Sequence, residues 1–381
     1  TEVEENADGT IASLTLNQTA PAEHPVLRPH RLAVGFYDED PATGKIVRTD
    51  RFELDVDGKS TVVAAAAGKK RPAFILVNDD DLTYTKLRFD ADSLSFALAI
   101  LQHFDDALAR AVVWLSLWDM TRDGDLAAEK FIDTTLALLA TETESTTFRY
   151  ALSCMSTTAW HYTAPDRRAD VVKHVAKELW KLVIAAPGGS DQQFQLVTAY
   201  LGYGEEGDAE FAEHAQGLFD GSLIVVGLEI DNNFTWTIIN ALSSVKLIDQ
   251  AGIDAQLAKR DTTENREFAL GAHAVRGDAA AKEWAWNEAL NNADLTNMQL
   301  EAVARGFGAT PRPDLAEPYA AKYYDVVDWV WKNKSFHMAE ALLEGLYPYY
   351  ADPATLVELG HRWLADHEDA DNALKRIVRG N

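Results

Sequence analysis

The spacing of apolar residues changes once along this 381-residue chain, and that change constrains the fold more than any other feature. Before residue 90, apolar residues alternate with others, as in Leu32, Val34 and Phe36, which is the period of half-buried strands. From Leu94 onward they recur three and four positions apart, which is helical spacing. The pattern predicts a mainly α fold with two domains, an all-β domain over residues 1–90 and an α-helical domain over 91–381.

The β part predicts about seven short antiparallel strands packed as a sandwich. Asp57-Gly58 is a favoured hairpin dipeptide, and Asn78 to Asp81 is expected to form a second hairpin turn with solvated carboxylates. Strands are expected at 11–16, 31–37, 52–56, 61–63, 74–77 and 82–89.

The helical part repeats one theme, amphipathic runs separated by short polar turns. Asp90 is a candidate cap for the first helix, and a stripe from Val171 to Val183 stops at Pro187-Gly188-Gly189. Asp261 with Glu264 resembles a capping box, and Asp352-Pro353 marks a further helix start. About 14 to 16 helices joined by short loops favour a HEAT-like or armadillo-like solenoid over a bundle.

The charge of the chain restricts its partners. A net charge of −25 repels phosphate backbones and anionic lipid, so we expect neither nucleic-acid nor membrane binding. Cationic ligands such as protonated peptide amines are favoured, provided that acidic side chains cluster on the inner face of the solenoid. The polar start at Thr1 to Asp8 and the absence of a membrane-length apolar run predict a cytoplasmic protein without a signal peptide.

Motifs that could carry chemistry are sparse. The zinc motif HExxH is absent, and the histidines are scattered, among them His24, His30, His361 and His367. Gly202 to Gly207 matches GxGxxG but follows a helical run instead of a strand, which disfavours a nucleotide loop. Asp79 to Asp81 lack the alternate spacing of an EF-hand, and the single cysteine, Cys154, is expected to be a buried thiol.

Two further residue classes leave alternatives open. Ten tryptophans, including Trp114 and Trp118, fit a helical core, but they also fit a sugar cleft served by a pair of acids. Arg110, Arg122 and Arg305 are candidates to bind a peptide carboxylate, although each also fits a surface or ion-pair role. The residues alone therefore predict no catalytic, cofactor-binding or metal-binding residue, and they leave the peptide-binding residues unknown.

Several strings resemble the actinobacterial branch of the aminopeptidase N family of gluzincin zinc metallopeptidases. They are QTAPAEHPVLRPHRL (Gln18 to Leu32), LVNDDDLTYTKLRFD (Leu76 to Asp90) and WDMTRDG (Trp118 to Gly124), and weaker matches follow over 264–290 and near the C-terminus. In that family a β-domain and a thermolysin-like domain with GxMEN and HExxH precede a small β-sandwich and a helical domain. The resemblance covers only the last two.

The resemblance implies that zinc and the catalytic residues lie upstream of Thr1, and that this chain is inactive alone. It implies a chamber wall that closes over the active site of a peptidase and restricts the access of peptides. A free-standing helical scaffold that binds a protein partner is the alternative from the solenoid pattern. A glycosidase is a third hypothesis, suggested only by tryptophan and carboxylate content.

Overall fold

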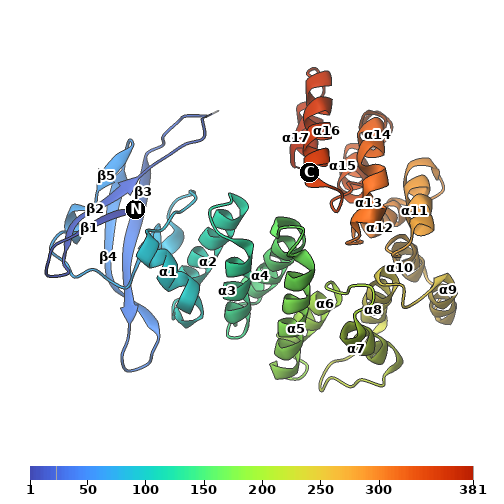
Figure 1. The fold of residues 1–381 in the computed structure, drawn as a ribbon, viewed down its shortest axis with the longest axis horizontal. Coiled ribbons are helices and arrows are strands. Elements are labelled where there is room, and N and C mark those ends of the chain that lie inside the picture. Colours follow the sequence, from blue (N-terminus) through green and yellow to red (C-terminus); the bar gives the residue numbers. More distant parts are fainter. Residues whose placement is uncertain (23, 381) are drawn as a thin grey trace. The chain divides into compact units, whose positions relative to one another are not determined.

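The computed structural model describes residues 1–22 and 24–380, and the chain divides into two compact units, Thr1–Glu178 and Leu179–Asn381 (Figure 1). Glu23, within the first string quoted above, and Asn381, the last residue of the predicted helical domain, lie outside the described residues. Described strands end at Val77 and α-helices begin at Ala91, so the mainly helical fold with an N-terminal β region is confirmed. A domain boundary at residue 90 stays a prediction.

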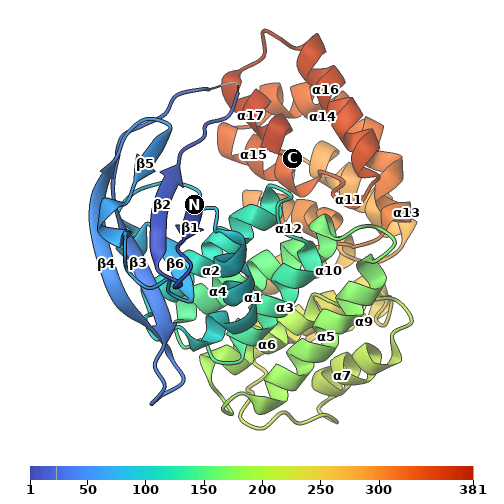
Figure 2. The same cartoon turned by 60° about the vertical axis from the view of Figure 1, so that its left-hand side comes forward.

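Two three-stranded antiparallel sheets form the β region (Figures 1 and 2). The first has the order β1-β2-β5, with β1 at Glu2–Glu5, β2 at Ile11–Asn17 and β5 at Ser60–Val62. The second has the order β4-β3-β6, with β3 at His30–Glu39, β4 at Ile46–Val56 and β6 at Phe74–Val77. Both sheets contribute to one apolar core, as a sandwich requires: Ile11, Leu14, Leu16, Leu32, Val34, Phe36, Val56 and Ile75.

Two predictions for the β region are wrong. Asp57-Gly58 does not close a hairpin, because β4 and β5 belong to different sheets and the chain crosses between them there. Residues 82–89 form no strand, because Asn78, Asp80 and Asp81 all adopt positive φ and turn the chain away from β6. The Asn78 side chain fixes this turn by accepting from the Thr83 amide at 3.0 Å and donating to the Thr83 carbonyl at 2.8 Å.

The first unit continues with helices that pack beside the sheets. They are α1 (Ala91–Ile100), α2 (Ala107–Arg122), α3 (Ala128–Leu139), α4 (Ser145–Thr157) and the start of α5 (Arg168–Ala185). α1 contacts β6, and α3 contacts both α2 and α4. Asp90 caps α1 as predicted, because its carboxylate accepts from the Ser93 amide at 3.0 Å.

The second unit is built from consecutive helix pairs. The pairs α7 with α8, α9 with α10, α11 with α12, α14 with α15 and α16 with α17 are each in contact. The second members, α8, α10, α12, α15 and α17, also contact one another in that order, and we call them the second-helix layer. The bounds are α6 Asp191–Leu201, α7 Ala209–Asp220, α8 Asn232–Ser244, α9 Gln250–Lys259, α10 Thr263–Ala274, α11 Ala279–Asn291, α12 Asn297–Gly308, α13 Pro313–Ala316, α14 Ala320–Asn333, α15 Phe336–Gly345, α16 Pro353–Asp366 and α17 Asn372–Gly380.

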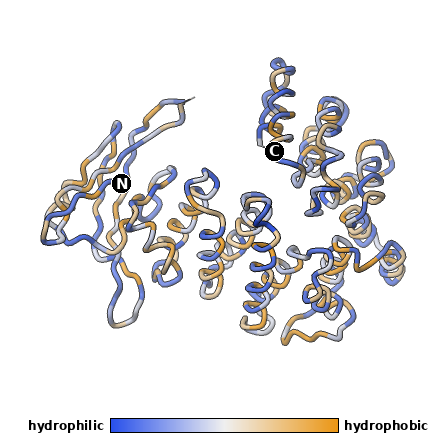
Figure 3. The backbone as a smooth tube through the Cα atoms, in the orientation of Figure 1, coloured by the Kyte–Doolittle hydropathy of each residue, from blue (hydrophilic) through white to orange (hydrophobic). Residues whose placement is uncertain are grey.

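Seventeen α-helices are thus present within the described residues, slightly more than predicted. Figure 3 shows polar and apolar residues mixed along each helix, as expected for helices that bury one face. Pairwise stacking inside the second unit is the packing of helical repeats. A solenoid that runs through all the helices of the chain stays a prediction.

The helix ends account for part of the acidic excess. Within the described residues, eight helices have an aspartate whose carboxylate accepts from the first-turn amides, where the helix dipole favours a negative charge: Asp90, Asp106, Asp208, Asp231, Asp249, Asp278, Asp352 and Asp371. The predicted stop after Val183 is confirmed, since α5 ends at Ala185. The capping box at Asp261 is wrong by one residue, because Thr262 caps α10 while Asp261 pairs with Arg266 at 2.6 Å.

Candidate functional site

The second-helix layer carries a groove of about 370 Å³ over α8, α10 and α12, which we call the α8–α10–α12 groove. Its position follows from glycines that let two helices approach closely. A Cβ atom on Gly306 of α12 would lie 2.6 Å from the carbonyl oxygen of Gly271 of α10, so no longer side chain fits there at this helix separation. The groove is lined by Asn240, Glu267, Phe268, Gly271, Val275, Met298, Ala302, Arg305, Gly306 and Ala309.

The groove offers an apolar floor and two opposite charges. Phe268 and Met298 supply apolar surface, and the Met298 side chain is 52% exposed. Glu267 and Arg305 make no ion pair with any described residue, so both remain available to a ligand. By contrast, Glu301 pairs with His337 at 3.4 Å and Glu340 pairs with Arg376 at 3.7 Å farther along the layer. This arrangement suits a ligand with an apolar body and a carboxylate near Arg305.

The charge of the groove bears on the predicted attraction of peptide amines. That prediction required acidic side chains to cluster on the inner face, and the groove carries one acidic and one basic side chain. It therefore gives no support to an acidic binding surface. Acidic side chains gather instead around the loop between α16 and α17, including Asp366, Glu368, Asp369 and Asp371.

The three arginines that the sequence suggested as ligands of a peptide carboxylate have different environments in the structure. Arg110 is buried and makes a bidentate pair with Glu142 at 2.8 and 3.0 Å, so it is not available to a peptide. Burial raises the pKa of Glu142, but the Arg110 guanidinium and the amides of Thr143 and Glu144 together outweigh that effect and keep the pKa below its usual range. Arg122 lies over the Trp118 ring at 5.9 Å, and only Arg305 lines the groove.

The aspartate cluster at Asp79 to Asp81 forms a turn with Asp81 exposed, as predicted, but Asp79 and Asp80 are held by ion pairs instead of water alone. Asp79 is 1% exposed, accepts from the Tyr37 hydroxyl at 2.6 Å and pairs with Arg48 at 2.7 Å. Asp80 pairs with Arg48 and with Arg51, both at 2.8 Å. Two arginines thus neutralise the carboxylates of Asp79 and Asp80, which explains this pair as part of an ion-pair network instead of a calcium site.

The remaining sequence motifs have structural explanations. Gly202 to Gly207 follow α6, and Glu206 in this loop pairs with Lys246 at 3.1 Å and Arg312 at 2.5 Å. Trp114 and Trp118 are buried, which confirms their core role, and Cys154 is also buried. Burial raises the pKa of the Cys154 thiol to about 11, so this thiol stays protonated at neutral pH.

Two absences concern the described residues only. No group of three or more His, Cys, Asp or Glu side chains in residues 1–22 and 24–380 could hold a metal ion. Within the same ranges, none of the helices combines the length and the apolar character needed to span a bilayer. The predicted absence of catalytic and cofactor-binding residues stays a prediction.

The sequence analysis did not identify most residues that line the groove. Arg305 was a candidate, but Glu267, Phe268 and Met298 were not. They come together only through the packing of α10 against α12, and neither helix carries a sequence motif that indicates this contact. The available signal was the pair of glycines inside helical segments, Gly271 and Gly306, where glycine costs stability and so indicates close packing.

Comparisons with known proteins agree with the resemblance found in the sequence. Residues 74–380 match the family model for the ERAP1-like C-terminal domain. An aminopeptidase N of Streptomyces lividans is 34% identical over 383 residues. The match covers 99% of this chain but 44% of that relative, so the chain spans less than half the length of the longer protein.

Proposed function

This chain belongs to the family of ERAP1-like C-terminal domains, and from that premise we propose that it is the non-catalytic C-terminal region of a zinc aminopeptidase that removes N-terminal residues from peptides. The observation that carries the proposal is the 34% identity to an aminopeptidase N over 99% of the chain. The absence of HExxH and GxMEN from the sequence supports a non-catalytic role. A cytoplasmic location and peptide substrates belong to the same proposal.

The proposed role is a chamber wall. Residues 1–90 serve as a spacer, and residues 91–381 close over the active site of the longer enzyme and restrict the entry of peptides. The α8–α10–α12 groove supports this role, because an apolar floor with one free guanidinium suits the distal end of a peptide. Contacts far from the reacting bond affect long substrates more than short ones.

Zinc does not fit the described residues of this chain. They offer no group of three metal-ligating side chains, so no catalytic step is assigned to them. In the proposal, the zinc ligands belong to the part of the longer enzyme that this chain does not span.

The first test is an activity assay of the isolated chain. Aminoacyl-nitroanilides are supplied with and without added zinc, and the proposal predicts no turnover above background. Zinc-dependent release of nitroaniline by the isolated chain would refute the non-catalytic role.

The second test addresses the chamber wall in the longer enzyme. Arg305→Glu reverses the charge in the groove, and Arg379→Glu makes the same change at an exposed position of α17 outside it. We expect Arg305→Glu to lower the ratio of kcat/KM for a ten-residue peptide to kcat/KM for an aminoacyl-nitroanilide by about tenfold, the value of one charge-assisted hydrogen bond. Arg379→Glu should leave the ratio unchanged, and equal ratios in both variants would contradict the role of the groove.

A helical scaffold that binds a protein partner is the second candidate. The stacked helix pairs of the second unit favour it, since such layers form extended binding surfaces. The coding sequence upstream of Thr1 decides between the scaffold and the peptidase region. A reading frame that starts near Thr1 favours the scaffold, whereas a frame that continues upstream through HExxH favours the peptidase.

A further inference from the structure

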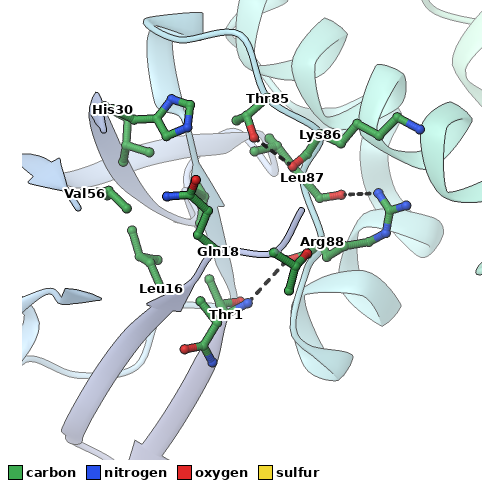
Figure 4. A pocket seen from close by; sticks show the side chains of 13 residues that line it. Thr1, Leu16, Gln18, His30, Val56, Thr85, Lys86, Leu87 and Arg88 are labelled. Carbon is green, nitrogen blue, oxygen red and sulfur yellow. Dashed lines mark hydrogen bonds between the residues drawn. The ribbon is translucent and has the colours of Figure 1, made fainter. Parts of the chain in front are cut away.

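A slot lies at the start of β1, between the end of β2 and the segment Thr85–Arg88 (Figure 4). Leu16, Asn17 and Gln18 form one wall, and the Thr85–Arg88 segment forms the other. The second sheet supplies an apolar floor, because Leu32, Val56 and Val77 all line the slot. Its volume is about 140 Å³, and all its residues belong to the first unit.

The slot lies in line with β1. Glu2 pairs with Thr15 and Val3 pairs with Leu14 in antiparallel register. Continuing this register places Thr1 opposite Leu16, and it places the next two residues upstream opposite Asn17 and Gln18, which are wall residues of the slot. The Thr1 nitrogen also donates to the Arg88 carbonyl at 3.4 Å, so β1 already touches the opposite wall at this end.

The Thr85–Arg88 wall has the properties of a strand without a partner. Its sequence pattern predicted a strand over 82–89, yet the backbone amides of residues 84–89 donate to no described residue. Leu82 is 47% exposed and Tyr84 is fully exposed just before it. Exposed strand edges of this kind are templates for pairing with another strand.

We propose that this slot receives an extended segment of polypeptide that leads directly into β1. The segment pairs antiparallel with Leu16–Gln18 and parallel with Thr85–Arg88, because Figure 4 places Arg88 at the Thr1 end of the slot and Thr85 at the His30 end. Alternate side chains of the segment pack on Leu32, Val56 and Val77, so small apolar residues suit those positions. Thr85–Arg88 then becomes the strand that its sequence predicts.

The segment is supplied in cis, for two reasons. Register and direction continue from β1 without a break, and attachment at Thr1 gives the segment a high effective concentration at the slot. The Streptomyces lividans relative has more than half of its chain outside the match, so a longer protein has residues to supply. The inference concerns the folding of the first unit and does not depend on the proposed peptidase role.

The test adds a short extension to the chain. Thr-Val-Thr is placed before Thr1, and amide hydrogen exchange is followed by NMR at Thr85, Lys86, Leu87 and Arg88. Alternate amides in this segment should exchange at least about fivefold more slowly, the value of one net backbone hydrogen bond. An extension of equal length, Thr-Pro-Thr, should not protect them, because proline lacks a donor and breaks strand pairing.

Two results would overturn the proposal. One is unchanged exchange at all four amides in the chain with Thr-Val-Thr. The other is equal protection by the free peptide acetyl-Thr-Val-Thr-amide at the same concentration as the protein, because this would remove the argument for a segment attached at Thr1. Protection by the linked Thr-Val-Thr alone supports it.

Discussion

The Lys282→Met substitution tests how the second unit satisfies its helix ends. Lys282 of α11 is 2% exposed, and its Nζ donates to the carbonyls of Ala274 at 2.7 Å and of Gly306 and Phe307 at 3.1 Å. It also contacts the Thr310 hydroxyl. One amine thus serves the C-terminal ends of both α10 and α12, where carbonyls lack partners within the helix.

The magnitude follows from these contacts. Methionine fills a similar volume but leaves three buried carbonyls without a donor, at a cost of about 1 to 3 kcal/mol each, partly offset because a polar amine is no longer taken out of water on folding. We expect a net loss of about 3 kcal/mol in the free energy of unfolding at pH 8. Urea denaturation followed by tryptophan fluorescence measures it, and Trp284 and Trp286 on the same helix report on this region. The exposed Lys332→Met is the matched control and should change stability by less than about 0.5 kcal/mol.

The difference in stability between wild type and Lys282→Met should depend on pH. Burial lowers the pKa of Lys282 to about 7, against the opposing charge of Asp278. Between pH 7 and 10.5 the unfolded chain holds a proton that the folded chain has released, so stability from this group rises with pH by about 1.4 kcal/mol per unit. Below pH 7 both states are protonated and the contribution is constant. The gap between wild type and Lys282→Met should therefore be about 1.4 kcal/mol smaller at pH 6 than at pH 8. A gap that is constant from pH 6 to 9 would refute the burial argument.

Three further substitutions test the packing described above. Asp79→Ala should lower the free energy of unfolding by about 3 kcal/mol in urea, because its arginine and tyrosine partners lose a buried acceptor; a change below about 0.5 kcal/mol would contradict the network. Asp90→Ala should cost about 1 kcal/mol through loss of the α1 cap. Burial raises the pKa of Asp90, but its hydrogen bonds to Ser93 and the charge of Arg71 outweigh that effect and lower the pKa. The stability that Asp90 contributes is therefore present above its ordinary pKa and is lost as the pH falls through its pKa in the folded protein. In thermal unfolding, the difference between wild type and variant should be smaller at pH 3 than at pH 7. Gly306→Ala should cost about 1 to 3 kcal/mol by separating α10 from α12, whereas Gly380→Ala meets no atom within 4 Å and should be neutral in the same thermal scan.

The sequence predicted the features that local patterns determine. Strand β2, strand β3, the end of α5 and the caps at Asp90 and Asp352 all depend on residues within a few positions of one another. Alternation, capping side chains and proline act over that range, so the element types and several boundaries were within reach.

Features made by distant residues were not within reach. Asp79 lies in a segment with the residues of a turn, yet its carboxylate is buried and pairs with Arg48 of β4. Nothing in residues 78–81 indicates that partner. Lys282 has helical spacing typical of a surface residue, yet its Nζ reaches carbonyls in the last turns of two other helices. Residues 82–89 have the period of a strand, and the turn at Asn78 to Asp81 removes them from the sheet that would have paired with them.

The candidate groove shows the same division. Arg305 was a candidate from residue type alone, whereas its setting depends on Gly271 and Gly306 meeting between helices. Arg110 was an equal candidate by type, and its bidentate pair with Glu142, 32 positions away, removed it. Residue type identified arginines that could bind a carboxylate, whereas tertiary packing determines which of them is accessible to a ligand.

The most direct test of the central claim is the intact mass and metal content of the native protein that carries this sequence, isolated from its source cells. We expect one polypeptide of more than twice the 42.1 kDa of this chain, with bound zinc and with HExxH among its upstream peptides. A native polypeptide of about 42.1 kDa that holds no zinc would contradict it.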